Sequence, residues 1–479
     1  MLKQNKGITL IALIITIIVM MILVAVSVTV ALNGGLFGTV KDAASKTQIE
    51  AEKEMLLSAV VGAIGIDAKV DFSEIQLPDG FTGENGIYES SSGNRFAVTE
   101  NGEINEVIFI YKDKIEGLGT GVTLVPYAEL TGDLKTAADL GKISAVLKET
   151  KDRIEMQAVL PAGFEVSTED GEDTISGGLV VSDVNENEFV WVPCTTNEND
   201  ASGLTEYAQD TQYNDGTTAS FQNLYAAYSD WTDKGGNANS VSKYGGFYVG
   251  RYEAGIPRNA PFYADADGAE YITEGRNTTK YIPVSKPKNP SWNFITQPNA
   301  KIVSAAMYDS SISVESSLMD SYAWDTIVSW MESEISGIAT NSTKYGNYIN
   351  SNFLLTDSLY AIYKYNWTTS ILINPSEYKK GTIEIPARSR TEEQTLYEIA
   401  TGSTENTKVL NIYDMAGNVW EWTTEEGNND SKTGISKYAI LRGGAHFYGG
   451  YPISARHGYY LSDSGAGFDI GFRVVLYIK

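Results

Sequence analysis

The side chains that could perform nucleophilic or acid–base chemistry are few in this chain of 479 residues. It has one cysteine, Cys194, and two histidines, His446 and His457. The histidines could act as general acid and base beside Asp463 and Asp469 if the fold brings them into one pocket. A lone cysteine more often behaves as a small buried apolar residue than as a nucleophile. One cysteine also excludes an intramolecular disulfide, and two histidines exclude a metal site built on three.

The segment that holds both histidines has the composition of a binding surface. Tyrosine, serine, glycine and aspartate dominate residues 445–469. Recognition loops have this composition because rigid aromatic rings supply contact area and small residues supply adaptability. The expected ligand-binding residues are His446, Phe447, Tyr448, Tyr451, His457, Tyr459, Tyr460, Asp463, Phe468 and Asp469. The alternative, which stays open at this point, is that half of these aromatic rings simply pack the domain.

A series of ordered motifs surrounds this segment. The longest reads Asn-Ile-Tyr-Asp-Met-Ala-Gly-Asn-Val-Trp-Glu-Trp-Thr at 411–423, and Leu-Arg-Gly-Gly and Ile-Gly-Phe-Arg-Val-Val follow it. The motifs lie at 188–193, 244–253, 411–423, 441–444 and 470–475. The series resembles the formylglycine-generating-enzyme, or sulfatase-modifying-factor, family over roughly residues 154–479. That resemblance implies a C-type-lectin-like fold of short strands, helices and long loops.

The chemistry of that family depends on residues that this chain lacks. Its enzymes oxidise a substrate cysteine with their own cysteine pair, which the resemblance places between Arg442 and Gly471. Residues 442–479 contain no cysteine. Iron-dependent relatives need a histidine set that two histidines cannot supply. We therefore expect a domain that is not an enzyme and that uses neither copper nor iron.

The resemblance also implies a calcium loop. In relatives the ion is held by an acidic or amide side chain, two backbone carbonyls and a glutamate, which are hard oxygen ligands of the kind that calcium accepts. The matching positions here are Asp414, Gly417, Val419 and Glu421. The alternative is a turn capped by Asp414 that places Trp420 and Trp422 in the core. A calcium loop and such a turn are compatible with each other.

The same set of C-terminal motifs is similar to that of the variable proteins of diversity-generating retroelements. In these proteins a lectin-like C-terminal domain keeps a fixed scaffold while selected positions vary. Most residues expected to bind ligand could descend from asparagine codons by changes at adenine positions. Tyrosine, serine and aspartate are also ordinary surface residues, so both interpretations stay open.

The N-terminus has a different character. Residues 7–40 carry no charged side chain, and Lys3 and Lys6 precede them. The stretch from Ile8 to Leu32 is long enough to span a membrane as a helix of about 20 apolar residues, and the two lysines predict that the N-terminus stays inside. A secretory signal peptide, which has a shorter apolar region, and a plain signal anchor are the alternatives.

The residues that follow Lys6 indicate a particular protein family more specifically than the apolar run does. Gly7 followed by Ile-Thr-Leu-Ile resembles the prepilin cleavage site of type IV pilins and pseudopilins over roughly the first 60 residues. The resemblance implies that a prepilin peptidase cleaves between Gly7 and Ile8, and that the apolar helix then packs into a filament. The family usually carries a glutamate where this chain has Ala12, which leaves a minor or tip role open.

These patterns together predict an α+β fold with a long N-terminal pilin helix. Apolar residues recur at helical spacing beyond the membrane-length run. An Asn-Gly pair at 101–102 predicts a hairpin in a small β head, and further helices are expected over 134–153 and 314–332. The expected parts are a leader (1–7), the pilin helix (8–66), the β head (67–115), a connector (116–153) and the lectin-like domain (154–479).

The net charge of the chain limits the kinds of partner that it can bind. The chain has 36 basic and 61 acidic residues and a net charge of −25, which disfavours nucleic acid because its phosphates attract basic surfaces. We expect a pilin-like adhesin at the cell surface, in an extracellular filament or in the membrane before assembly. Its expected partners are other pilin subunits, a prepilin peptidase, the membrane and an extracellular protein or glycan. The alternatives are an exported enzyme with altered chemistry and a structural pseudopilin of a secretion system.

Overall fold

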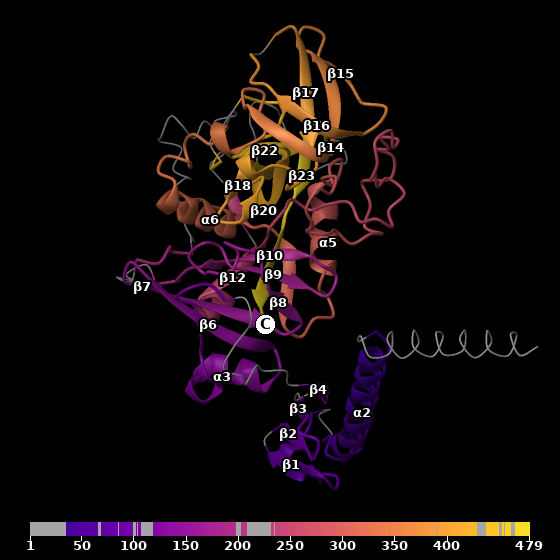
Figure 1. Cartoon of the computed structure of the whole chain (residues 1–479), viewed down its shortest axis with the longest axis vertical. Coiled ribbons are helices and arrows are strands. Elements are labelled where there is room, and N and C mark those ends of the chain that lie inside the picture. The colour runs from indigo at the N-terminus through magenta and orange to yellow at the C-terminus, as the bar shows by residue number, and fades with distance from the viewer. Residues whose placement is uncertain are drawn as a thin grey trace, which may run out of the picture. The chain divides into compact units, whose positions relative to one another are not determined.

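The computed structural model divides the chain into two compact units, Met1–Val107 and Ile108–Lys479 (Figure 1). The structure describes residues 35–65, 69–84, 86–98, 102, 104–106, 118–197, 203–207, 231–233, 235–389, 391–428, 437–449, 453–454, 456–460 and 465–479. Gly7 and Ile8 of the predicted cleavage site lie outside these residues. The predicted domain boundaries stay predictions.

The first unit is a helix packed on a small antiparallel sheet. Its elements are α2 (Gly35–Gly62), η1 (Phe72–Glu74), β1 (Phe81–Glu84), β2 (Ile87–Ser90), β3 (Arg95–Val98) and β4 (Ile104–Glu106). Leu56 and Val60 of α2 are fully buried against Tyr88 and Phe96 of the sheet. The hairpin predicted around the Asn-Gly pair is confirmed, since Val98 pairs with Ile104 and Gly102 has φ of 83°.

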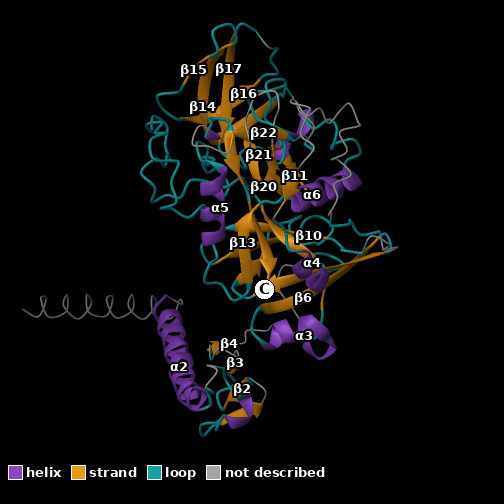
Figure 2. Ribbon diagram, turned by 180° about the vertical axis from the view of Figure 1, so that it is seen from behind, coloured by secondary structure: helices purple, strands orange, loops and turns teal. Residues whose placement is uncertain are grey.

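The predicted fold class is wrong. The described residues hold five α-helices, the longest being α2 with 28 residues, and most of their regular structure is strand (Figure 2). Of the pilin helix predicted over 8–66, the described residues show only α2, and residues 8–34 lie outside them. From Lys41 onward α2 mixes charged and polar residues with apolar ones. Within the described part of the chain, no helix has the length and apolar character needed to cross a membrane.

The second unit begins with a three-stranded sheet. Its elements are β5 (Thr123–Leu124), η2 (Tyr127–Glu129), α3 (Gly132–Asp139), β6 (Ile143–Lys151) and β7 (Ile154–Pro161). The helix predicted over 134–153 is therefore wrong beyond Asp139. Gly141, with φ of 65°, interrupts it, and the continuous apolar run that follows is buried in β6, where it pairs with β7. A short apolar run suits a buried strand as well as a helix.

A six-stranded sheet forms the centre of this unit. Its strands, in spatial order, are β13 (Val314–Leu318), β24 (Val474–Ile478), β12 (Gly246–Gly250), β10 (Glu188–Pro193), β9 (Val180–Asp183) and β8 (Phe164–Val166). Both faces are buried: along β10, Phe189 and Trp191 enter one apolar cluster, while Val190 and Val192 enter the other. The helices are α4 (Ala238–Tyr244), α5 (Gln297–Ala306) and α6 (Ser321–Glu334).

The helix predicted over 314–332 is only partly correct. Residues 314–318 form strand β13, whose side chains alternate between buried and exposed positions. The helix α6 begins after Asp320, whose carboxylate accepts a hydrogen bond from the Ala323 backbone N–H and so caps the first turn.

Two further sheets complete the unit. One contains β11 (Trp231–Asp233), β20 (Trp420–Asn428), β21 (Lys437–Arg442), β22 (His457–Tyr460) and β23 (Ile470–Phe472). The other, at the top of Figure 1, contains β14 (Phe353–Asn366), β15 (Ile371–Ile373), β16 (Lys379–Ile385) and β17 (Glu393–Ile399). The unit also contains η3 (Thr343–Tyr345) and η4 (Glu405–Thr407), and β18 (Lys408–Val409) pairs with β19 (Ile412–Tyr413) as a two-stranded sheet. The strands predicted at 188–193 and 438–442 are confirmed as β10 and β21.

Candidate ligand-binding site

The C-terminal motifs meet in a buried ion pair. Glu421 on β20 accepts hydrogen bonds from Arg473 at 3.1 Å, 3.0 Å and 2.6 Å. The same guanidinium donates to the carbonyl oxygens of Gly250 and Tyr413, each at 2.9 Å. Both charged side chains are fully buried. Arg473 therefore joins β12, β19 and β20 to the end of the chain.

The predicted calcium positions include one member of this ion pair, Glu421. Both carboxylate oxygens of Glu421 face the Arg473 guanidinium. Asp414 is engaged by the Thr401 hydroxyl at 3.0 Å and the Gly402 N–H at 2.7 Å. Across the residues that the structure describes, no group of three or more His, Cys, Asp or Glu side chains could hold a metal ion. The other carboxylate oxygen of Asp414 is buried without a hydrogen-bond partner among the described residues. Calcium at Asp414, Gly417, Val419 and Glu421 stays a prediction. Trp420 and Trp422 both lie in the core.

Asn418 of the same loop is the centre of a second buried network. Its side-chain N–H groups donate to Glu253 at 2.7 Å and to the Ile399 carbonyl at 3.0 Å. Its carbonyl oxygen accepts from the Ile399 N–H and from Asn347, each at 3.1 Å. Its φ of 57° is in the left-handed region. One side chain thus fixes the loop against β17 and the segment after β12.

The residues that could react are packed in the core. Burial lowers the pKa of His446 and of His457 to about 4, so both rings are neutral at pH 7. His446 stacks on Tyr363 with ring centroids 5.6 Å apart, and His457 stacks on Trp420 at 5.3 Å. Cys194 is buried at the end of β10, and burial raises the pKa of its thiol.

Part of the predicted binding segment forms one aromatic cluster. The Phe447 ring centroid lies 5.5 Å from that of Phe468 and 4.8 Å from that of Tyr448. Tyr365 and Trp367 complete the cluster, at 4.6 Å and 4.8 Å from Phe447. The sequence analysis missed these two residues, although aromatic residues recur along β14 and could have drawn attention to them.

Of the other predicted contacts, His446 also borders this cluster, with its ring centroid 5.6 Å from that of Phe468. Tyr459 packs beside Trp422, with centroids 6.3 Å apart. Asp469 is buried, and burial raises its pKa to about 7. Tyr451, Asp463 and the side chain of Tyr460 lie outside what the structure describes. The ligand contacts expected of this segment stay a prediction, with His446 and Asp469 lying inside the domain.

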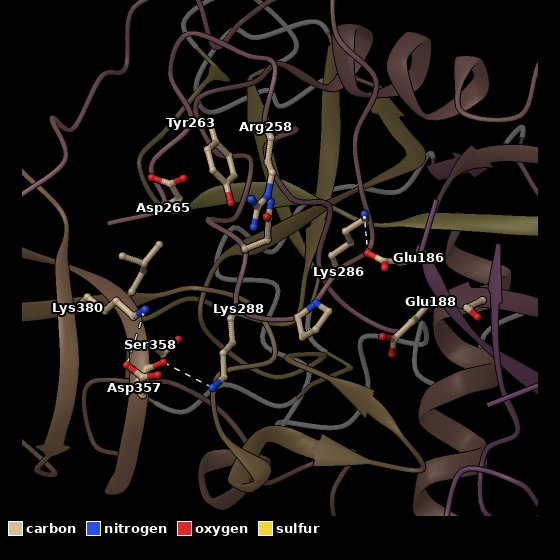
Figure 3. A pocket seen from close by; sticks show the side chains of 14 residues that line it. Glu186, Glu188, Arg258, Tyr263, Asp265, Lys286, Lys288, Asp357, Ser358 and Lys380 are labelled. Carbon is tan, nitrogen blue, oxygen red and sulfur yellow. Dashed lines mark hydrogen bonds and ion pairs between the residues drawn. The ribbon is translucent and has the colours of Figure 1, made fainter. Parts of the chain in front are cut away.

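A cavity of about 670 Å³ opens elsewhere on the second unit (Figure 3). Its walls come from the β9–β10 turn, from the long segment between β12 and α5, and from β14 and β16. Its lining residues are mostly polar or charged. They are Ser182, Glu186, Glu188, Arg258, Tyr263, Asp265, Lys286, Pro287, Lys288, Asn289, Asp357, Ser358, Leu359 and Lys380. The sequence analysis did not find this site, because its residues are scattered over the chain.

The charges of this cavity are only partly paired with one another. Lys286 lies 3.6 Å from Glu186, and Lys380 lies 3.8 Å from Asp357. Among the described residues, no carboxylate forms an ion pair with Arg258 or Lys288. The Lys288 amine reaches only the backbone carbonyl of Asp357, at 3.5 Å, as the dashed line in Figure 3 marks.

The backbone of the cavity wall is strained at charged residues. Glu186, Lys288 and Asp357 have φ of 63°, 54° and 40°. They are three of the eleven residues other than glycine with positive φ in the described part of the chain. Each such conformation costs about 1–3 kcal/mol and tends to persist where function requires it. Charged residues therefore occupy three backbone positions of the cavity wall that glycine could adopt without conformational strain.

The comparison with known proteins finds a matching family for the C-terminal part of the chain. Residues 363–478 match the family described as "Sulfatase-modifying factor enzyme 1-like domain". The chain contains a domain of this family. The expected C-type-lectin-like region is therefore confirmed for this stretch, which begins within β14 and ends with β24.

Two solved structures are similar to the chain at a weak level. They are the "Major Tropism Determinant I1 Variant" and the "Major Tropism Determinant P3c Variant", each with 13% identity. Their TM-scores are 0.27 and 0.26, over 83% and 84% of this chain and 96% and 97% of theirs. A likeness this weak carries no argument, so similarity to variable proteins of diversity-generating retroelements stays a prediction. No curated protein sequence shows significant similarity to the chain.

Proposed function

We propose that the chain is a recognition protein displayed at the cell surface, whose second unit, which includes the sulfatase-modifying-factor-type stretch, binds a ligand and catalyses no reaction. The observation that carries the proposal is a contrast in burial. Cys194, His446 and His457 are all packed in the core. An open cavity of about 670 Å³ presents charged and amide side chains instead.

The alternative of an enzyme with altered chemistry is less well supported. A general acid or base must reach the proton that it transfers. His446 is fully buried and stacked between aromatic rings, and His457 is buried against Trp420. The family's cysteine pair has no counterpart between Arg442 and Gly471. These arrangements favour binding.

A binding experiment with matched variants separates the two functions. The full chain, kept soluble in a mild detergent, is applied to arrays of glycans and of cell-surface proteins, and saturable binding to some of them is expected. The Cys194→Ala variant should bind within about twofold of the natural chain, because the loss of a buried sulfur at a site remote from the cavity changes packing and not recognition. Absence of binding on every array would contradict the proposal, as would chemical conversion of a ligand that Cys194→Ala abolishes.

Display at the surface is proposed from the N-terminal sequence. The apolar stretch Ile8–Leu32 would hold the chain in the membrane, and a prepilin peptidase would cut after Gly7. Other pilin subunits would then be neighbours of this chain. Ala12 in place of the usual glutamate favours a minor or tip position in a filament.

Processing is expected to leave Ile8 as the N-terminal residue of material sheared from intact cells. Mass spectrometry of that fraction measures it directly. A Gly7→Arg variant is expected to keep Met1 and to stay in the membrane fraction, because the resemblance places the cleaved bond at this glycine. An intact Met1 in the natural chain, found only in membranes, would exclude the pilin-like route and leave a tethered surface protein.

A further inference from the structure

We propose that the cavity formed by the β9–β10 turn, residues 258–289 and the β14–β16 pair binds a saccharide that carries a carboxylate group. The inference rests on the proposed recognition function and assigns it a site and a ligand class. The carboxylated sugar would be part of a glycan on the surface that the chain recognises.

The first argument is the distribution of charge. The chain as a whole has a net charge of −25, yet this one cavity gathers Arg258, Lys286, Lys288 and Lys380. Four carboxylates line it as well, so its formal charge is zero. Two of the cations already face carboxylates. Arg258 has the Tyr263 hydroxyl as its neighbour, and among the described residues neither Arg258 nor Lys288 is in an ion pair with a carboxylate. An anionic group of the ligand would lie beside these two side chains.

The second argument is the chemistry of the two cations that have no carboxylate partner among the described residues. Figure 3 shows Arg258 directed toward the middle of the lining side chains, with Tyr263 and Asp265 beside it. Its guanidinium lies 5.8 Å from the Tyr263 ring centre. A guanidinium binds a carboxylate through two parallel hydrogen bonds. The Lys288 amine has donors to spare, since it makes one long contact to a backbone carbonyl.

The third argument selects a sugar from among the anions. Apart from the Tyr263 ring, the lining offers little apolar surface, with Pro287 and Leu359 as its aliphatic side chains. A peptide anchored by acidic residues would leave the remaining carboxylates of the cavity facing its own acidic groups. Sugar hydroxyls can donate to carboxylates such as that of Asp265, while a carboxylate on the same ring accepts from Arg258. The volume of about 670 Å³ lies within the usual range for small-molecule sites.

The fourth argument is that the wall holds its charges in place before any ligand arrives. The backbone N–H of Lys288 donates to the Thr401 carbonyl at 2.7 Å. Next to it, the buried Asn289 side chain donates to the Ile256 carbonyl at 2.6 Å. These bonds hold the backbone at Lys288, whose side chain lines the cavity. A rigid wall lowers the entropy lost on binding.

Calorimetric titration of the full chain in mild detergent tests the inference, with glucuronic acid and N-acetylneuraminic acid as probes. Both acids are expected to bind about tenfold or more tightly than glucose, because glucose lacks the charged acceptor for Arg258. Arg258→Gln and Lys288→Gln are each expected to weaken binding of the acids by about fivefold to tenfold. The matched control is Lys364→Gln, which removes an exposed lysine of β14 outside the cavity and should leave affinity unchanged.

Several outcomes would overturn the inference. Equal affinity for glucose and glucuronic acid would show that the carboxylate is not recognised. Unchanged affinity in both cavity variants would place the sugar elsewhere on the chain. Inorganic phosphate or a tetraglutamate peptide that displaces the acid sugars at equal concentration would indicate an unselective anion site. If the acid sugars do not bind but binding on the arrays is saturable, the saccharide site is wrong and the recognition function still holds. If nothing binds in either experiment, both proposals are contradicted.

Discussion

Replacing Arg473 with methionine is expected to lower the free energy of unfolding by about 3–5 kcal/mol, because a buried carboxylate is left without its partner. Among the described residues, Glu421 accepts its hydrogen bonds from this one guanidinium, and both side chains are fully buried. The carbonyls of Gly250 and Tyr413 lose a donor as well. Methionine is long enough to fill most of the space, so the loss reports charge and hydrogen bonding more than volume.

Urea denaturation followed by tryptophan fluorescence measures this loss. Lys148→Gln is the control, because it removes an ion pair of 2.9 Å whose side chains are 45% and 66% exposed, and it should cost at most about 1 kcal/mol. The double variant Arg473→Met with Glu421→Leu is expected to regain about half of the loss, since the buried charge is gone while the two carbonyls stay unpaired. Equal stability of Arg473→Met and Lys148→Gln would show that the buried pair contributes no more than a surface pair.

Asn418→Ala is expected to destabilise the chain by about 3–4 kcal/mol, because several buried polar groups lose their partners at once. The Ile399 N–H and carbonyl and the Glu253 carboxylate all bond to this side chain. Alanine would also keep the strain of a φ of 57° without the hydrogen bonds that hold it.

A glycine at the same position separates the two effects. Asn418→Gly removes the same hydrogen bonds but adopts positive φ freely, so it should be more stable than Asn418→Ala by about 1 kcal/mol. Asn185→Ala, at an exposed turn, is the control and should change stability by at most about 0.5 kcal/mol. A glycine variant no more stable than the alanine variant would show that strain at this residue is negligible.

Local patterns in the sequence were sufficient for several elements. The apolar run at 188–193 forms β10, and the Asn-Gly pair at 101–102 marks the β3–β4 hairpin. The ordered C-terminal motifs indicated a sulfatase-modifying-factor-type domain, which the match over 363–478 confirms for that stretch. These features depend on neighbours in the chain, so a single sequence carries them.

Helix and strand were confused where the local pattern allows both. The apolar residues after Gly141 suit a helix by spacing, but pairing with β7 makes them a strand. Residues 314–318 form a strand because β24 lies beside them, although β24 comes at the far end of the chain. Such pairing depends on residues remote in sequence, and hydrophobic periodicity contains no information about them.

The sequence by itself determined which chemistry is missing: one cysteine, two histidines and a strongly acidic composition follow from counting. Only the tertiary structure decided where the remaining side chains lie. It buries His446 and His457 among aromatic rings, engages Glu421 with Arg473, and assembles a cavity from the β9–β10 turn, residues 258–289 and the β14–β16 pair. The physical reason is that burial and ion pairing depend on which distant segments pack together, and that is a property of the whole fold.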